Sequence, residues 1–333
     1  MGSAAENKEY NYCLDVLKGI ACIFVVFMHC EFPGLLGTAV QCVSRFCVPF
    51  FFMVSGYYYF HDEQWSREEK RSYALRKIRH LGGIILPAVC LYLAFAVVRG
   101  GVTAVSAEQI VGFVLFNQPF IIAGQLWFLF ALLYDYLVFA VIDRFDLREK
   151  SYYCIPVLMA AYICLAQGAH LAGISVQNMY YRNFLVEGLC FFLLGNWIRS
   201  RKDRLNLTNR ALLAVIILST LLCPVERMLM GRDFGVNIVT FPQVTALFLY
   251  GLNNPTKGKG SVLGRLGGKL SMLVYIFHPA VWHTLEAVYA KLHWNQRTSM
   301  LYLMPVLVVG LTIACAVIYR GVLGVIKKRN GYD

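Results

Sequence analysis

Three ionisable residues lie along one apolar segment near the N-terminus, LDVLKGIACIFVVFMH (residues 14–29). In a helix, Lys18 and His29 lie about three turns apart on one face, and Asp15 lies one turn before Lys18. His29 then sits about 16 Å along the helix from Lys18. Two interpretations are open. Lys18 and His29 lie at the two membrane surfaces, or the acid, the base and the imidazole do chemistry inside the membrane, where ionisable residues usually carry function.

A second basic cluster, ALRKIRHLGG, precedes the third apolar segment. Arg76 and Arg79 are three positions apart, so both lie on one side of a helix at the expected cytoplasmic surface. Two guanidinium groups beside Lys18 suit a polyphosphate better than a lipid headgroup. Short basic pairs are also common at membrane borders, and anchoring alone explains one arginine.

Further polar or aromatic residues in the apolar segments are candidates for substrate contacts. These candidates are Arg45, Trp127, Glu187, Glu226 and His278. Arg45 begins the second segment and can meet His29 or an anionic acceptor. His278 has a structural role as the alternative, and Trp127 is either an aromatic at the membrane interface or a stacking platform. The eleven cysteines contain no CxxC pair, so we interpret them as small core residues and expect no metal site.

The composition is that of a membrane protein. Of the 333 residues, 58% are hydrophobic and only 15% are charged. Runs of about 17–25 apolar residues can span a bilayer. We expect an all-α polytopic protein with about ten spans in one bundle, at residues 14–32, 44–60, 78–98, 124–143, 152–167, 183–199, 211–225, 236–252, 271–290 and 299–320. The stretch 107–117 is too short to span.

The distribution of basic residues gives the orientation. With both termini in the cytoplasm, 24 of the 31 Lys and Arg residues fall on the cytoplasmic side. This asymmetry also explains the net charge of +12 without a nucleic-acid partner. The predicted organisation is a cytoplasmic tail (1–13), a transmembrane domain (14–325) and a short cytoplasmic tail (326–333), with no cleavable signal peptide.

The order of these motifs resembles the acyltransferase-3 family of membrane acyltransferases. Lys18, followed by Gly-Ile-Ala, and His29 match the family's first helix, and VPFFFMVSG (48–56) is similar to its second. Arg76 and Arg79 match its Arg-x-x-Arg at the third helix. GQLWFLFALL and LVYIFHP, which contain Trp127 and His278, are similar to two later helices. The resemblance implies a ten-span core and covers nearly the whole chain.

The resemblance implies transfer of an acyl group, most often acetyl, from cytoplasmic acyl-CoA to a hydroxyl or amine of a glycan, lipid-linked sugar or small molecule. His29 would be the general base, and Lys18, Arg76 and Arg79 would bind the donor's phosphates. Asp15 would pair with Lys18 or Arg79. The alternative is a transporter or flippase-like module for a small amino acid or an acylated compound. We expect a multi-pass protein of the cell membrane, in contact with lipid, and leave a homodimer open.

Overall fold

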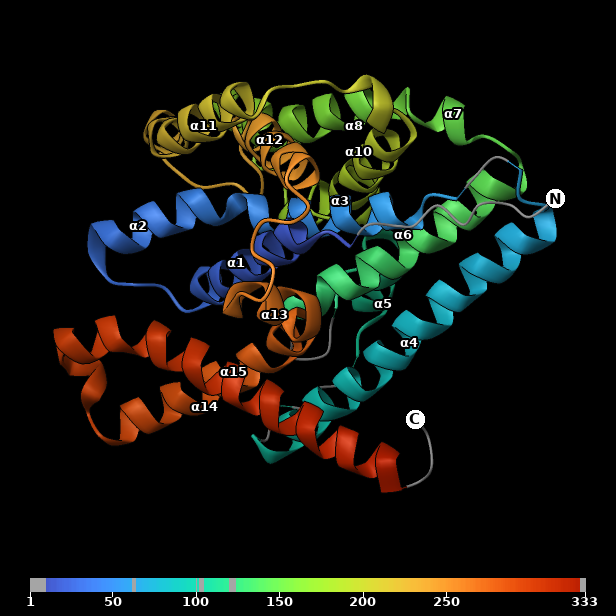
Figure 1. The fold of residues 1–333 in the computed structure, drawn as a ribbon. Helices are drawn as coiled ribbons and strands as arrows, with labels where there is room; N and C mark the ends of the chain where they lie inside the picture. The colour runs from blue at the N-terminus through green and yellow to red at the C-terminus, as the bar shows by residue number, and fades with distance from the viewer. Residues whose placement is uncertain (1–9, 62–63, 100, 102–104, 120–123, 330–333) are drawn as a thin grey trace. The chain divides into compact units, whose positions relative to one another are not determined.

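The computed structural model of the chain is built of helices joined by turns and loops (Figure 1). It describes residues 10–61, 64–99, 101, 105–119 and 124–329, and these contain no strand. The chain groups into two compact units, which are treated separately below. The first unit contains residues 1–47, 207–224 and 239–333. The second unit contains residues 48–206 and 225–238.

The first unit is arranged around α1 (Tyr12–His29), which packs against six other helices. The other helices of this unit are α2 (Gly34–Val43), η1 (Ser44–Phe46), α11 (Asn209–Met230, with its last turns in the second unit), α12 (Thr240–Asn253), α13 (Val262–Lys269), α14 (Ser271–Lys291), η7 (Trp294–Gln296) and α15 (Thr298–Arg329). α14 and α15 run antiparallel, joined through η7 (Figure 1).

The second unit contains a long helix, α4 (Arg67–Val98), which lies beside α6 (Trp127–Arg144). Its other helices are α3 (Cys47–Tyr59), α5 (Ala107–Phe116), η2 (Gly124–Leu126), α7 (Arg148–Ser151), α8 (Cys154–Ile163), η3 (Cys164–Gly168), α9 (Ala169–Leu171), η4 (Asn178–Tyr180), η5 (Phe184–Gly188), α10 (Leu189–Ser200) and η6 (Lys202–Arg204). η3 and η5 are π-helical, a wider form that occurs often at functional sites.

Glycines allow two pairs of helices to touch through their backbones. A Cβ atom at Gly19 of α1 would lie 2.2 Å from the carbonyl oxygen of Leu263, and one at Gly267 of α13 would lie 1.9 Å from that of Asp15. In the second unit, a Cβ atom at Gly56 of α3 would lie 1.9 Å from the carbonyl oxygen of Phe192. Small residues at such positions let membrane helices approach closely. The glycines after Lys18 and Ser55 therefore have a packing role.

Seven helical segments among the described residues are long and apolar enough to cross a membrane. They are Tyr12–His29, Gly34–Tyr59, Arg67–Val98, Gly124–Arg144, Arg148–Leu171, Asn209–Met230 and Thr298–Val325. The chain is therefore an all-helical integral membrane protein in its described part. Each of these seven segments overlaps a predicted span. The short helix α5 was predicted not to span, and its ten residues are indeed too few.

The other three predicted spans are helical but do not reach that length and apolar character. η5 with α10 covers residues 184–200, α12 has only 14 residues, and α14 is interrupted by polar side chains. The count of ten, the orientation of the termini and the domain limits stay predictions. Residues 1–9 and 330–333 of the two predicted tails lie outside the described residues.

The contact between α1 and α13 predicts that Gly267→Ala destabilises the protein. The new methyl group meets backbone atoms, which cannot move aside as a side chain can, and overpacking of this kind costs about 1–3 kcal/mol of unfolding free energy. Thermal unfolding in detergent, followed by size-exclusion chromatography, measures the loss. Gly310→Ala in α15 is the matched control, because nothing lies within 4 Å of a Cβ atom there. Equal melting of both variants would contradict the contact.

Candidate functional site

The N-terminal half of α1 holds a partly buried ion pair. Asn11 caps the helix by accepting a hydrogen bond from the N–H of Leu14 (2.8 Å), and Asp15 lies in the first turn, where a carboxylate is favoured. The Lys18 ammonium lies 2.6 Å from one carboxylate oxygen of Asp15, and the Tyr10 hydroxyl donates to the other. Both oxygens of a carboxylate that is only 6% exposed are thus engaged. Of the two partners considered for Asp15, the structure shows Lys18.

At the other end of α1, the imidazole of His29 stacks on the imidazole of His278 from α14. The two ring centroids are 5.2 Å apart and the planes differ by 28°. His29 is half-buried, whereas His278 has no exposed surface. The packing of α14 against α1 therefore brings together two residues that are 249 positions apart in the chain.

Local hydrogen bonding fixes the tautomer of His278. Its Nδ1 lies 3.3 Å from the carbonyl oxygen of Val274, which can only accept, so Nδ1 carries the proton. The other nitrogen, Nε2, then has a lone pair, and it is buried with no hydrogen-bond partner among the described residues. A buried imidazole with an unused lone pair can accept a proton or a hydrogen bond from a bound molecule.

Gln41 of α2, which the sequence did not single out, supports the end of α1. Its amide donates to the carbonyl oxygens of Phe27 (3.2 Å) and Met28 (3.0 Å), which lack helical donors because α1 ends there. Its own carbonyl oxygen accepts from Arg45 Nη2 at 3.1 Å. Arg45 is therefore linked through Gln41 to the backbone beside His29. The only signal in the sequence was a polar residue within an apolar stretch.

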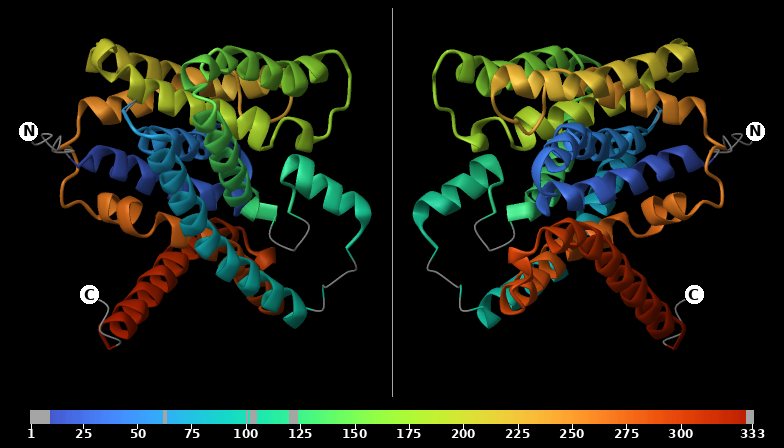
Figure 2. Two further views of the ribbon diagram at one scale, coloured as in Figure 1. Left: turned by 90° about the vertical axis from the view of Figure 1, so that its right-hand side faces the viewer. Right: turned by 90° about the vertical axis from the view of Figure 1, so that its left-hand side faces the viewer.

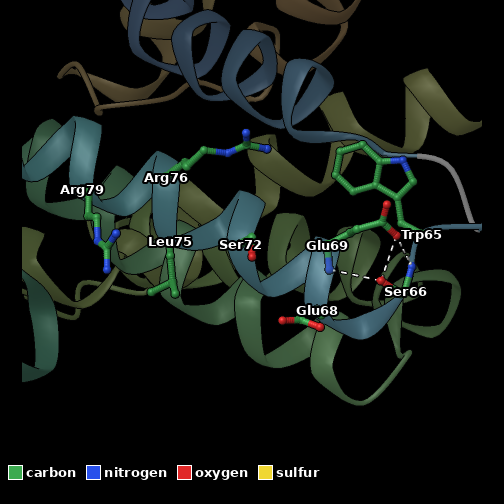
Figure 3. A pocket seen from close by; sticks show the side chains of 8 residues that line it. All are labelled: Trp65, Ser66, Glu68, Glu69, Ser72, Leu75, Arg76 and Arg79. Carbon is green, nitrogen blue, oxygen red and sulfur yellow. Dashed lines mark hydrogen bonds between the residues drawn. The ribbon is translucent and has the colours of Figure 1, made fainter.

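In the second unit, Arg76 and Arg79 line one cavity of about 560 Å³ at the start of α4 (Figure 3). Figure 3 shows Arg76 extended toward Trp65. Arg79 lies one turn further along the helix, and its side chain points in a different direction. The two arginines, predicted to lie on one side of a helix, line the same cavity, but their guanidinium groups do not run parallel. Cavities of about 300–1,000 Å³ are typical of small-molecule sites.

The start of α4 is fixed by a capping box that occupies one of the two acidic residues at the cavity. Ser66 donates from its N–H and its hydroxyl to Glu69 Oε2, both at 2.8 Å, and its hydroxyl accepts from the N–H of Glu69 at 3.2 Å. Glu69 and the other acid, Glu68, are both exposed. The cavity thus presents guanidinium groups at one end and an aromatic ring at the other.

Trp65, also missed in the sequence, stacks on His61 with ring centroids 4.9 Å apart and planes within 9°. His61 is held in turn, because its Nε2 lies 3.0 Å from Asp143 and its carbonyl oxygen accepts from Arg148 Nη1 at 2.7 Å. Nearby, Lys70 donates to Asp146 at 2.8 Å, and this hydrogen bond lowers the pKa of the exposed Asp146 carboxyl. His61, held by Asp143 and Arg148, therefore supports one face of the Trp65 indole.

A third group of polar residues lies elsewhere in the second unit. Arg182 lies over the Trp127 ring at 4.6 Å, and a Cβ atom at Gly235 would contact both Arg182 and the carboxylate of Glu187. Trp127 is 5% exposed and is thus a buried aromatic rather than an interfacial one. Arg182 therefore contacts the predicted Trp127, and it lies with the predicted Glu187 close to Gly235.

Glu226 belongs to the same unit and is held by two donors. Gln167 Nε2 donates to it at 2.6 Å and the N–H of Ile238 at 2.7 Å. Gln167 lies in the π-helix η3, as Glu187 lies in η5, so both π-helices carry buried polar side chains. A π-helix cannot be recognised from the periodicity of the sequence.

The predicted residues thus form groups in two units. Asp15, Lys18, His29, Arg45 and His278 belong to the first unit. Arg76, Arg79, Trp127, Glu187 and Glu226 belong to the second. Among the described residues, no group of three or more His, Cys, Asp or Glu side chains could hold a metal ion.

A model of the acyltransferase-3 family, defined as an acyltransferase domain, matches residues 11–320, nearly the whole chain. The chain belongs to the acyltransferase-3 family. Comparison with curated proteins and with solved structures gives no match. In this membrane acyltransferase, the matched range includes Asp15, Lys18 and His29 of α1 and His278 of α14. The resemblance seen in the sequence is confirmed at the level of the family.

The ion pair on α1 predicts that Asp15→Asn destabilises this acyltransferase. Lys18 would keep its charge but lose its partner, at a cost of about 1–3 kcal/mol of unfolding free energy, between the values for exposed and for fully buried pairs. The double variant Asp15→Asn/Lys18→Met removes both charges, so its unfolding free energy should fall by less than that of the single variant. Titration with a denaturing detergent measures both. A single variant as stable as the wild type would show that the pair does not hold α1.

Proposed function

We propose that the chain transfers an acyl group, in the simplest case acetyl, from cytoplasmic acyl-CoA to a hydroxyl or amine of a glycan, a lipid-linked sugar or a small molecule. The observation that carries the proposal is the stacked pair of His29 and His278 in a chain that belongs to the acyltransferase-3 family. We place the protein in the cell membrane, with its basic loops toward the cytoplasm.

In this proposal His29 is the general base. Its imidazole takes the proton of the acceptor's O–H or N–H as the acceptor atom forms a bond to the acyl carbon. The bond between that carbon and the sulfur of CoA breaks, and the thiolate takes the proton from the imidazolium. His278, buried behind His29, orients the His29 ring or accepts a hydrogen bond through Nε2. The Asp15–Lys18 pair fixes the first turns of the helix that carries the base.

The cavity at the start of α4 suits the nucleotide end of the donor. CoA combines an adenine ring with phosphate groups, and the cavity combines the Trp65 indole with the guanidinium groups of Arg76 and Arg79. Because His61 supports one face of Trp65, the indole can offer a fixed surface for stacking. The neighbouring carboxylate of Glu69 is engaged by Ser66 and so competes less for the arginines.

The group around Trp127, Arg182, Glu187 and Glu226 is our candidate for contacts with the acceptor. Its carboxylates and amide accept and donate hydrogen bonds, as recognition of a hydroxyl-rich molecule requires. Arg45 is a further candidate through its link to the backbone beside His29. The length of the acyl chain follows from none of these residues.

The proposal predicts that His29→Ala abolishes acyl transfer while acyl-CoA binding persists. Loss of a general base typically lowers the rate by about 10²–10⁴-fold. The test is hydrolysis or transfer of acetyl-CoA by the purified protein, together with binding by calorimetry. His80→Ala, which alters an exposed histidine of α4, is the control. Transport of a solute into liposomes without consumption of CoA would instead support a transporter.

Arg76→Ala/Arg79→Ala should abolish binding of acetyl-CoA, because the phosphates lose their cationic partners. Arg71→Ala removes an exposed arginine of the same helix that does not line the cavity, and should bind normally. Equal binding by the double variant and the control would show that the donor's phosphates bind elsewhere. Failure of the wild type to bind any acyl-CoA would overturn the proposed function.

The stacking role predicts a selective effect of Trp65→Ala. Loss of a stacked base costs about 1–3 kcal/mol, so binding of acetyl-CoA should weaken by about 5- to 150-fold. Binding of acetyl-pantetheine, which has no adenine, should not change. Trp65→Phe keeps a ring and should recover most of the affinity. Parallel weakening for both ligands would assign Trp65 a structural role only.

A further inference from the structure

A groove of about 580 Å³ lies between α13 and α15 of the first unit, apart from the residues used above. Its wall is apolar and includes Leu266 and Leu270 from the α13 side and Ile313 and Val317 from α15. Val317 is 53% exposed, and Figure 2 shows the C-terminal end of α15 extending away from the rest of this unit. α15 is long and apolar enough to span a membrane, and an open apolar groove on such a helix would face lipid.

Three cations line the same groove, namely Arg265, Lys269 and Arg320. Arg320 donates from Nη1 to the carbonyl oxygen of Lys269 at 2.6 Å and so ties α15 to the last turn of α13. Arg265 and Lys269 form no ion pair among the described residues, and none of the described lining residues is acidic. The groove is therefore apolar along its length and cationic at one end.

The sequence of α13 explains this arrangement. Leu263 and Gly267, four positions apart, face α1, whereas Leu266 and Leu270 form a second stripe toward the groove. Arg265 and Lys269 form a third stripe beside the second. The short helix thus separates the catalytic helix α1 from an amphiphilic surface.

We propose that this groove binds an anionic phospholipid of the membrane. The lipid phosphate lies among the three cations, and an acyl chain follows the apolar wall on α15. The charge of the groove selects an anionic headgroup, and its position at the basic end of a membrane span is where such headgroups occur. Basic pockets between helices on the cytoplasmic side of membrane proteins bind phosphate-bearing lipids. The proposal does not depend on the transfer reaction.

The test uses the full chain in detergent and native mass spectrometry with added lipid. Phosphatidylglycerol and phosphatidylcholine with identical acyl chains are compared. The wild type should retain phosphatidylglycerol at least about tenfold better, and Arg265→Gln/Lys269→Gln/Arg320→Gln should lose this preference. Lys202→Gln/Arg204→Gln/Arg210→Gln removes three exposed charges elsewhere and should keep it. Equal retention of both lipids by the wild type, or equal loss in both triple variants, overturns the proposal.

A second variant tests the groove while keeping its charges. Val317→Trp fills the apolar part from an exposed position, so the fold should tolerate it. It should release phosphatidylglycerol as the triple variant does. Unchanged retention would mean that surface charge alone attracts the lipid, and the groove would not be a site. Thermal melting of each variant confirms that it is folded, and this experiment stands even where the triple variant is unstable.

Discussion

The backbone contact between α1 and α13 is the constraint on which the position of the ion pair and of the histidine pair in the first unit depends. Gly19 and Gly267 allow carbonyl and amide groups of the two helices to approach to distances that no side chain permits. This contact fixes the rotation of α1 about its axis. The rotation in turn determines that Asp15 is buried against Tyr10 and that His29, about three turns further, faces α14. The glycine after Lys18 is thus part of the site, although it has no side chain.

Several polar groups in this apolar region have a clear structural role. Backbone carbonyl groups cannot be left without donors in a membrane, and Gln41 satisfies two at the end of α1. Asp15 and Lys18 neutralise each other. His278 Nε2 differs, since it is buried without a donor or acceptor among the described residues. This unused lone pair beside His29 is the feature on which the proposed role of the two histidines rests.

Helical periodicity was enough to place Asp15, Lys18 and His29 on one face of α1, because that relation is set by local geometry. It could not predict the contact of His29 with His278, which results from the packing of α14 across 249 positions. Trp65 was missed because a lone aromatic residue before a charged helix carries no periodic signal, and its role appears only once His61 supports it. The π-helices also escaped the sequence, since one extra residue per turn alters the backbone and leaves composition unchanged. Three of the predicted spans are shorter or more polar than the seven long apolar helices. Apolar runs in the sequence alone therefore do not give the number of membrane-spanning helices.

The order of the motifs in the chain differs from their grouping in space. The first and late helical motifs, with His29 and His278, meet in the first unit, whereas the motifs of the second and third helices belong to the second unit. The residues proposed for proton transfer and those proposed for donor binding therefore belong to separate frameworks, each with its own glycine contact, Gly19 with α13 and Gly56 with α10. Since rigid packing within each framework fixes its own groups, a change in one should leave the geometry of the other intact. The proposed binding of the donor and the proposed acid–base catalysis should therefore be distinguishable by mutation.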